Sequence, residues 1–219
     1  MVLCLVAIAF QTATPSIAIH RAFKRKEVQV YAVSVDSEGE AGKAHYDYEM
    51  RFSADRVVAE SKTTQITNSF VNLRGRIGDQ ELPKRRAFGV ATYQFPETGF
   101  PSDYSFGGQD ASFVIPVLSW LLPTEAIPVG GSFEVPDKVY DGFVHMKGSG
   151  SLVDATAAKA TIKLALAFGV PPAKGGRQAV AQSYFSSVAT FNLKNGALES
   201  SEGSMTGPSG SLNFKIRRV

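Results

Sequence analysis

An apolar run between residues 113 and 122 constrains the fold of this 219-residue chain more than any other feature. The run reads FVIPVLSWLL, and only Pro116 and Ser119 interrupt its apolar side chains. A segment that is apolar on every side is stable only when it is buried. It is too short to cross a bilayer as a helix, which takes about 20 apolar residues. Because proline is tolerated at the first position of a helix, Pro116 and Pro123 bracket a piece that fits two helical turns.

Most of the remaining chain alternates between apolar and polar side chains, which is typical of β-strands with one wet face. In residues 44–53 the even positions are mostly aromatic and the odd positions mostly charged. A looser alternation over 26–35 places Val28, Val30 and Ala32 on one side. Further strands are expected over 56–61, 64–73, 87–95, 102–106, 132–135, 143–153, 156–168, 178–193, 198–205 and 211–218. Residues 74–79 read as a turn-rich loop.

The number and spacing of these strands predict the fold class. About ten strands are too many for a flat open sheet, and Asn195-Gly196 is a strong hairpin signal. The length fits a single domain. We therefore expect an all-β fold: a strongly curved antiparallel sheet of about ten strands, shaped as a half-barrel, with a short apolar helix on its concave side.

The first eighteen residues resemble an export signal. Val2 to Phe10 supply an apolar core, and Ser16-Ile17-Ala18 offers the small residues that a signal peptidase reads. We expect cleavage after Ala18, a single domain over 19–219 and a periplasmic or secreted protein, although no cation precedes the apolar core. The alternative is a buried first strand. Leu3 stands where a lipoprotein signal needs a small residue before Cys4, and no later stretch reaches transmembrane length.

Composition argues against several classes of function. A net charge of +3 is small for a nucleic-acid-binding protein, and a single cysteine excludes an internal disulfide or a cysteine metal cluster. Gly107-Gly108 and Gly175-Gly176 lack the Lys-Ser/Thr ending of a phosphate loop, and Gly148-Ser149-Gly150 lies inside a predicted strand rather than at a nucleophile elbow. We expect no enzyme, no cofactor and no metal.

One constellation resembles a catalytic or metal site. His45, Asp47 and Glu49 fall on the same strand face about 7 Å apart, where they could bind a metal or share acid and base roles. The charged wet face of an ordinary sheet explains them equally well and is favoured. His145 would join them only if its strand lay next to theirs.

The densest basic run is Lys84-Arg85-Arg86, with Arg74 and Arg76 close in sequence. Such a run suits anionic lipid headgroups or cell-wall polymers. The simpler interpretation is a charged loop that keeps a sheet edge soluble.

Residues 19–26 form a basic segment that includes Arg21. We interpret this segment as a solvated N-terminal stretch.

Two short stretches resemble known proteins. Residues 122–133, LPTEAIPVGGSF, resemble an "L-P then P-V-x-V-G-D-x-W" stretch of uncharacterised bacterial envelope β-domain proteins, but depart from it at Gly131 and Phe133. Residues 190–198 are similar to the "F-x-L-x-x-G-x-L" hairpin of the same proteins. In overall plan the chain resembles the LolA, LolB and LppX type of lipid or lipoprotein carrier. That resemblance implies a half-barrel with an apolar hollow and transfers no residue roles.

The candidate ligand-binding residues come from the apolar run: Phe113, Val114, Val117, Leu118, Trp120 and Leu121. If the sheet curls fully around them they are core, and if the curl is incomplete they line a cleft for an acyl chain or for a partner's apolar segment. The first reading of function is an exported envelope protein that binds a lipid or acyl chain without catalysis. The alternative is a structural or interaction protein of the envelope, with a filled core and an envelope protein as its partner.

Overall fold

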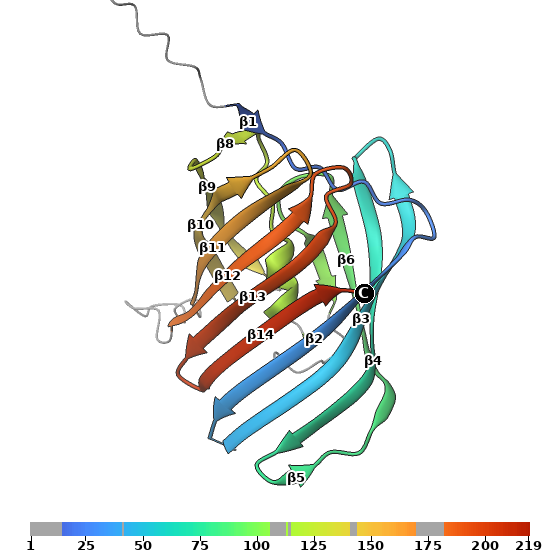
Figure 1. Cartoon of the computed structure of the whole chain (residues 1–219), viewed down its shortest axis with the longest axis vertical. Coiled ribbons are helices and arrows are strands. Elements are labelled where there is room, and N and C mark those ends of the chain that lie inside the picture. Colours follow the sequence, from blue (N-terminus) through green and yellow to red (C-terminus); the bar gives the residue numbers. More distant parts are fainter. Residues whose placement is uncertain (1–14, 41, 106–112, 114, 141–143, 170–181) are drawn as a thin grey trace, which may run out of the picture.

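The computed structural model of the chain describes residues 15–40, 42–105, 113, 115–140, 144–169 and 182–219. Their strands form one antiparallel sheet of 12 strands and a separate two-stranded sheet. Figure 1 shows the large sheet bent into an open trough, with the helical turn η1 (Ile115–Trp120) inside the bend. The all-β, curved antiparallel fold that the alternation predicts is confirmed, and the sheet does not close on itself.

Each half of the chain supplies half of the trough. The N-terminal half contributes β2 (Val28–Gly39), β3 (Gly42–Val58), β4 (Thr63–Ile77), β5 (Gln80–Glu81), β6 (Arg85–Pro96) and β7 (Ser102–Ser105). The C-terminal half contributes β9 (Ser132–Tyr140), β10 (Val144–Ala155), β11 (Lys159–Gly169), β12 (Gln182–Asn192), β13 (Leu198–Gly207) and β14 (Gly210–Arg218). The small sheet pairs β1 (Ser16–Ile17) with β8 (Ile127–Pro128).

The strand order is β7-β6-β4-β3-β2-β14-β13-β12-β11-β10-β9, with β5 paired to β4. Neighbours in the sheet are almost all neighbours in sequence, as expected of hairpin-connected antiparallel strands. Apart from β6, which pairs with β4 across the short β5, the exception is the seam where β2 meets β14, in which Val35 lies opposite Phe214 and Val33 opposite Ile216. Because of this seam η1, which comes midway along the chain, lies over β12, β13 and β14, and its Trp120 packs on Tyr31 of β2 and Phe52 of β3.

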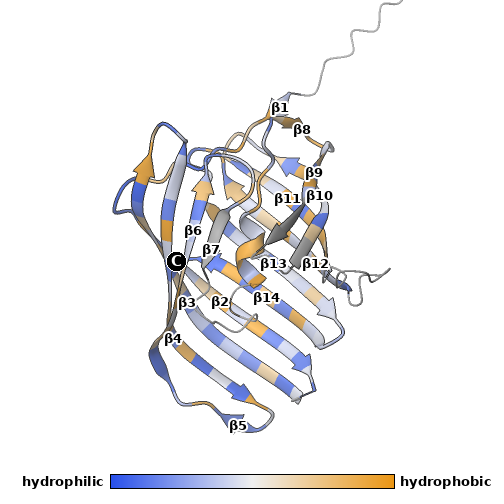
Figure 2. Ribbon diagram, turned by 180° about the vertical axis from the view of Figure 1, so that it is seen from behind, coloured by the Kyte–Doolittle hydropathy of each residue, from blue (hydrophilic) through white to orange (hydrophobic). Residues whose placement is uncertain are grey.

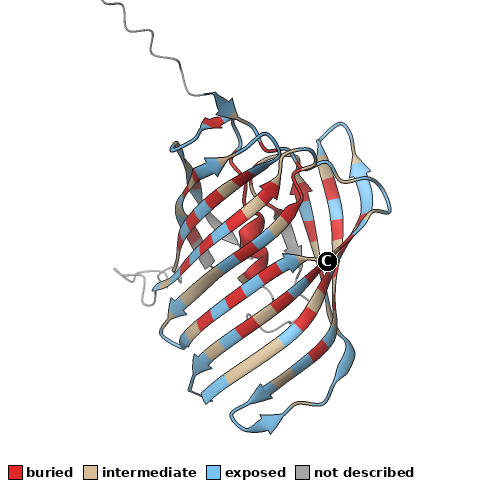
Figure 3. Cartoon of the chain, viewed as in Figure 1, coloured by how far each residue is buried: buried red, intermediate tan, exposed pale blue. Residues whose placement is uncertain are grey.

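The core lies on the concave face. Figure 3 shows buried and exposed residues alternating along the strands. On β3 the residues Tyr48, Met50 and Phe52 are 3%, 0% and 0% exposed. The hydropathy colouring of Figure 2 follows the same two-residue period. The alternation predicted over 44–53 is therefore confirmed.

Two details differ from the sequence prediction. Residues 74–77 continue β4 instead of forming a loop, and the turn begins only at Gly78, whose positive φ of 56° suits glycine. On β2 the inward side is Tyr31, Val33 and Val35, whereas Val28 is 55% exposed. In both places pairing with the neighbouring strand, β3 or β14, sets the register that local alternation leaves ambiguous.

The apolar run forms a 3-10 helix rather than two α-helical turns. Pro116 is its second residue, and Leu121 N–H donates to Leu118 O at 3.3 Å, the i to i+3 spacing of a 3-10 turn. Pro123, which follows shortly after, cannot donate a hydrogen bond to extend the helix. None of the helices in the described ranges is long and apolar enough to cross a membrane.

The N-terminal segment is described from residue 15 onward, so Val2 to Phe10 of the predicted export signal lie outside the described residues. Ser16 pairs with Pro128 and Ile17 with Ile127, and the side chain of Ile19 is 1% exposed. Cleavage after Ala18 would remove β1 and leave Ile19 as the first residue of a trough that is otherwise intact. The export signal stays a prediction.

Candidate binding site on the concave face

Phe113, just before η1, sits in a cage of four aromatic rings. The ring centroids of Tyr46, Tyr48, Phe70 and Phe88 lie 5.5, 5.2, 6.5 and 4.9 Å from that of Phe113. These distances suit offset or edge-to-face contacts. We call these five residues the aromatic cage.

The cage forms because adjacent strands point aromatic side chains to the same face. Tyr46 and Tyr48 come from β3, Phe70 from β4 and Phe88 from β6, and these three strands are neighbours in the sheet. Tyr48 and Phe70 are buried, whereas Tyr46, Phe88 and Phe113 keep part of their surface exposed. The cage thus combines two buried rings with three partly exposed rings.

Trp120, at the other end of η1, is core. Its ring centroid lies 5.0 Å from that of Tyr31 and 4.8 Å from that of Phe52, and the residue is 1% exposed. Val117 and Leu121 are 2% and 3% exposed. Filled packing of this kind is the more common fate of large apolar side chains.

The six predicted binding residues therefore fall into three groups. Val117, Trp120 and Leu121 are buried in the core, Phe113 and Leu118 are partly exposed beside it, and Val114 lies outside the described residues. The partly exposed rings at the cage are Phe113 and, from the sheet, Tyr46 and Phe88, while Leu118 is partly exposed on η1. Sequence reasoning missed those two as site residues, although both stand in predicted strands.

Arg21 fastens η1 to the N-terminal segment. Its guanidinium donates to Pro96 O at 2.7 Å, to Gly99 O at 2.9 Å and to Trp120 O, and it stacks over the Phe95 ring at 5.2 Å. The residue is 5% exposed. The reading of this stretch as a solvated terminus is therefore wrong for Arg21, which holds the last residue of η1.

A second polar contact ties η1 to the sheet. Ser201 Oγ on β13 donates to Ser119 Oγ at 2.8 Å, and both side chains are buried. Since a buried hydroxyl without a partner is costly, this bond favours one orientation of η1 over the sheet.

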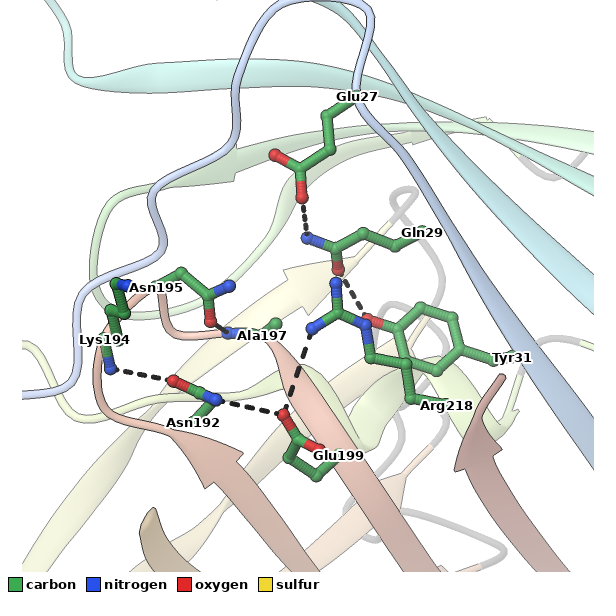
Figure 4. A network of polar contacts seen from close by, with 9 residues as sticks. All are labelled: Glu27, Gln29, Tyr31, Asn192, Lys194, Asn195, Ala197, Glu199 and Arg218. Carbon is green, nitrogen blue, oxygen red and sulfur yellow. Dashed lines mark hydrogen bonds and ion pairs between the residues drawn. The ribbon is translucent and has the colours of Figure 1, made fainter. Parts of the chain in front are cut away.

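Polar contacts, drawn in Figure 4, lie on both sides of the seam between β2 and β14 at one of its ends. Tyr31 Oη donates to Gln29 Oε1 at 2.5 Å, and Gln29 Nε2 donates to Glu27 at 2.9 Å. Across the seam, Arg218 lies 3.9 Å from Glu199, which accepts a hydrogen bond from Asn192. The first of these groups of contacts supports Tyr31, on which Trp120 packs, and the second ties β13 to β14 and to β12.

The buried side chains of the cage carry no formal charge. Burial raises the pKa of Tyr31, Tyr48 and Tyr93 above its usual value, so these phenols stay protonated at physiological pH. Among the buried residues that the structure describes, only Arg21 carries a formal charge. A face of this character suits an uncharged, apolar group rather than an ion.

Four hollows formed by described residues lie away from η1. One of about 480 Å³ lies over Ser34, Ser186 and Lys215, and one of about 740 Å³ over Gly148, Ala165 and Tyr184. The others, of about 440 and 600 Å³, lie beside His45 and beside Arg85. None of these four is lined by residues of η1.

The structure does not group His45, Asp47 and Glu49 as the sequence pattern suggests. His45 Nδ1 lies 2.8 Å from Asp36 Oδ1 on β2, and Nε2 lies 3.1 Å from Asp47 Oδ2. A bulge follows Asp47, and Glu49 instead accepts from Arg51 and Asn72. Within the described part of the chain no His, Cys, Asp and Glu side chains group into a metal site.

The strand of His145, β10, is separated from β3 by five strands, so the condition for its joining His45 is not met.

The two carboxylates make His45 a pH-dependent stabiliser. The hydrogen bond with Asp36 is the main cause that raises the pKa of His45 above its usual value, and Asp47 adds to it. The stabilisation is therefore complete below the unfolded value of about 6.5 and disappears as pH rises through the higher folded pKa. We expect His45→Gln to lose about 0.5 kcal/mol at acidic pH and almost nothing at about pH 8.5, measured by urea unfolding. An equal loss at both pH values would contradict this assignment.

Comparison with known proteins adds little to this site. No family model matches the sequence, and no curated protein matches it. Among solved structures, the chain is similar to a crystal structure described as an outer membrane lipoprotein-sorting protein domain from Vibrio parahaemolyticus. The two share 7% sequence identity over 89% of this chain and 84% of that chain, with a TM-score of 0.23. This likeness is too weak to indicate a function.

Proposed function

We propose that this protein is a non-catalytic envelope protein that binds a lipid or acyl chain at the aromatic cage, on the concave face of its trough. The observation that carries the proposal is a group of three partly exposed aromatic side chains in contact, Tyr46 and Phe88 against Phe113. Partly exposed apolar surface of this kind, gathered on the concave face, favours an apolar ligand.

The open sheet supports the same proposal. The strand order ends at β7 and β9, which do not pair with each other, so the two edges of the trough are free to separate. The partly exposed rings of the cage are held by contacts between side chains and not by strand pairing. A ligand can therefore displace them without breaking the backbone ladder.

One observation favours the alternative, a structural or interaction protein with a filled core. Val117, Trp120, Leu121 and Leu122 are at most 3% exposed, so most of the apolar run already packs against other residues of the chain.

Native mass spectrometry of protein purified from cells distinguishes the two functions. A bound lipid is expected for a carrier, and a bare chain mass for the alternative.

Removing the cage ring should weaken ligand binding selectively. Phe113→Ala is expected to lower the affinity for cis-parinaric acid, a fluorescent acyl chain, by about ten-fold or more, since burying a phenyl side chain contributes about 1.5–3 kcal/mol. The matched control is Phe23→Ala, which removes a partly buried ring that packs 5.9 Å from Phe95, outside the cage. An equal loss in both variants, with both still folded, would contradict binding at the cage.

A further inference from the structure

A cluster of five cations lies at one tip of the trough. We call it the basic corner, and it consists of Arg74, Arg76, Lys84, Arg85 and Arg86. Arg74 and Arg76 lie on β4, and Arg85 and Arg86 begin β6, which pairs with β4 so that Arg85 lies opposite Leu73. Figure 1 shows this tip, marked by β5, at the far end of the molecule from β1.

The basic corner accounts for the whole net charge of the chain. Residues 74–86 carry these five cations and two carboxylates, a net charge of +3, and the complete chain also has a net charge of +3. The remaining 206 residues therefore carry 18 cations and 18 acidic side chains. Along the sequence the net positive charge is therefore concentrated in residues 74–86, and in the fold Asp47 and Glu49 lie beside these cations.

The cations of the basic corner are exposed, and none of them forms an ion pair with another described residue. Asp47 and His45 lie opposite Arg74 and Arg76 in the β3–β4 register, but Asp47 contacts His45, and Glu49 contacts Arg51. Beside these side chains a groove of about 600 Å³ is lined by Arg74, Lys84, Arg85 and Arg86, together with Asp47 and Glu49. Guanidinium groups that keep their donors free are suited to phosphate oxygens.

Apolar side chains accompany the cations at the same tip. Ile77, the last residue of β4, is 39% exposed, and Pro83 is exposed directly before Lys84. A surface that binds a soluble anionic polymer needs charge alone, whereas a lipid surface rewards charge and apolar contact together. The combination favours a membrane over a polymer.

The basic corner also adjoins the aromatic cage. Gly75 lies between Arg74 and Arg76, and a side chain there would meet Tyr46 Cδ1 at 2.9 Å and Leu82 Cδ1 at 3.5 Å. Leu82 N–H donates to Gly75 O at 2.8 Å, which holds the β5 turn against this end of the cage. A molecule docked by the corner would present the Tyr46 end of the cage toward the lipid.

We propose that the basic corner docks this protein on an anionic lipid surface through headgroup phosphates. The docking itself does not require the proposed function. Only the passage of a ligand from the membrane to the cage rests on it.

Vesicle sedimentation tests the docking. We expect the full chain to bind vesicles of phosphatidylcholine with about one third phosphatidylglycerol, to bind pure phosphatidylcholine less, and to dissociate as salt rises above about 0.1 M. Lys84→Gln/Arg85→Gln/Arg86→Gln should lower the partition coefficient about a hundred-fold at low salt, because each cation near an anionic membrane contributes about ten-fold or less. Arg74→Gln/Arg76→Gln should lower it by at least several-fold, and normal tryptophan emission would confirm that both variants fold.

The matched control removes the same charge elsewhere. Lys163→Gln/Lys215→Gln/Arg217→Gln changes three exposed cations on β11 and β14, outside the corner, and should leave the partition coefficient within about two-fold. All variants keep residues 1–18, so any binding by that apolar segment is common to them. Equal losses in the two triple variants, no preference for anionic vesicles, or binding to polyglutamate as strong as to vesicles would overturn the proposal. Loss of docking with cis-parinaric acid binding intact would leave the proposed function standing.

Discussion

Replacing Trp120 with alanine is expected to lower the free energy of unfolding by about 3–5 kcal/mol, a large part of the stability of a typical domain. The Trp120 ring packs against Tyr31 of β2 and Phe52 of β3. Its backbone carbonyl accepts a hydrogen bond from the Arg21 guanidinium. Its loss leaves a cavity at the point where η1 meets the sheet. Urea unfolding followed by far-ultraviolet circular dichroism measures the change.

Leu118→Ala is the matched control for Trp120→Ala, because Leu118 lies on the same helical turn but keeps part of its surface exposed. We expect a loss of about 1–2 kcal/mol, less than the range for fully buried leucines. If Trp120→Ala cost no more than Leu118→Ala, η1 would not be the core element described here.

The second large effect is expected at Arg21. Arg21→Met keeps much of the apolar stem but removes the side-chain donor of the Pro96, Gly99 and Trp120 carbonyls, of which Gly99 O still accepts from Leu122 N–H, and this should cost about 3 kcal/mol. Trp120 is the single tryptophan of the chain, so its emission reports on η1 directly. We expect a blue-shifted maximum in the native protein and a red shift in the variant.

Arg25→Met controls for the loss of one cation in the same segment, since Arg25 is exposed. It should leave both stability and emission unchanged. A variant at Arg21 with native stability and an unshifted maximum would contradict the role of Arg21 in fastening η1.

The sequence allowed the fold class to be predicted because period-two alternation is a local property. The inward face of β3 could be read directly, since aromatic and charged side chains separate cleanly there. The faces of β2 could not, because Val28, Val30 and Ala32 are as apolar as the buried Tyr31, Val33 and Val35. Pairing with β14, at the opposite end of the chain, decides between them.

The candidate site was predictable only in part for the same reason. The apolar run identified Phe113 and Leu118, but the contribution of Tyr46 and Phe88 depends on which strands become neighbours. Arg21 gave no signal, since its partners are backbone carbonyls of residues 75 to 99 positions away. Side-chain patterns do not reveal contacts with the backbone.

The burial of η1 limits where a ligand can lie and how tightly it can bind. With Trp120 and Val117 already packed, we propose that an acyl chain lies against Phe113 and displaces the partly exposed rings of the cage. Because rearranging packed rings takes up part of the binding free energy, we expect moderate affinity rather than the tightest class.

The most direct test of binding at the cage is quenching of Trp120 by a brominated stearic acid. Bromine quenches tryptophan only at close range, and Trp120 lies on the same helical turn as Leu118. The predicted result is saturable quenching of the native protein by brominated but not by plain stearic acid, and weaker quenching in Phe113→Ala. Emission unchanged by the brominated acid, in protein that also carries no lipid when purified from cells, would contradict the proposal.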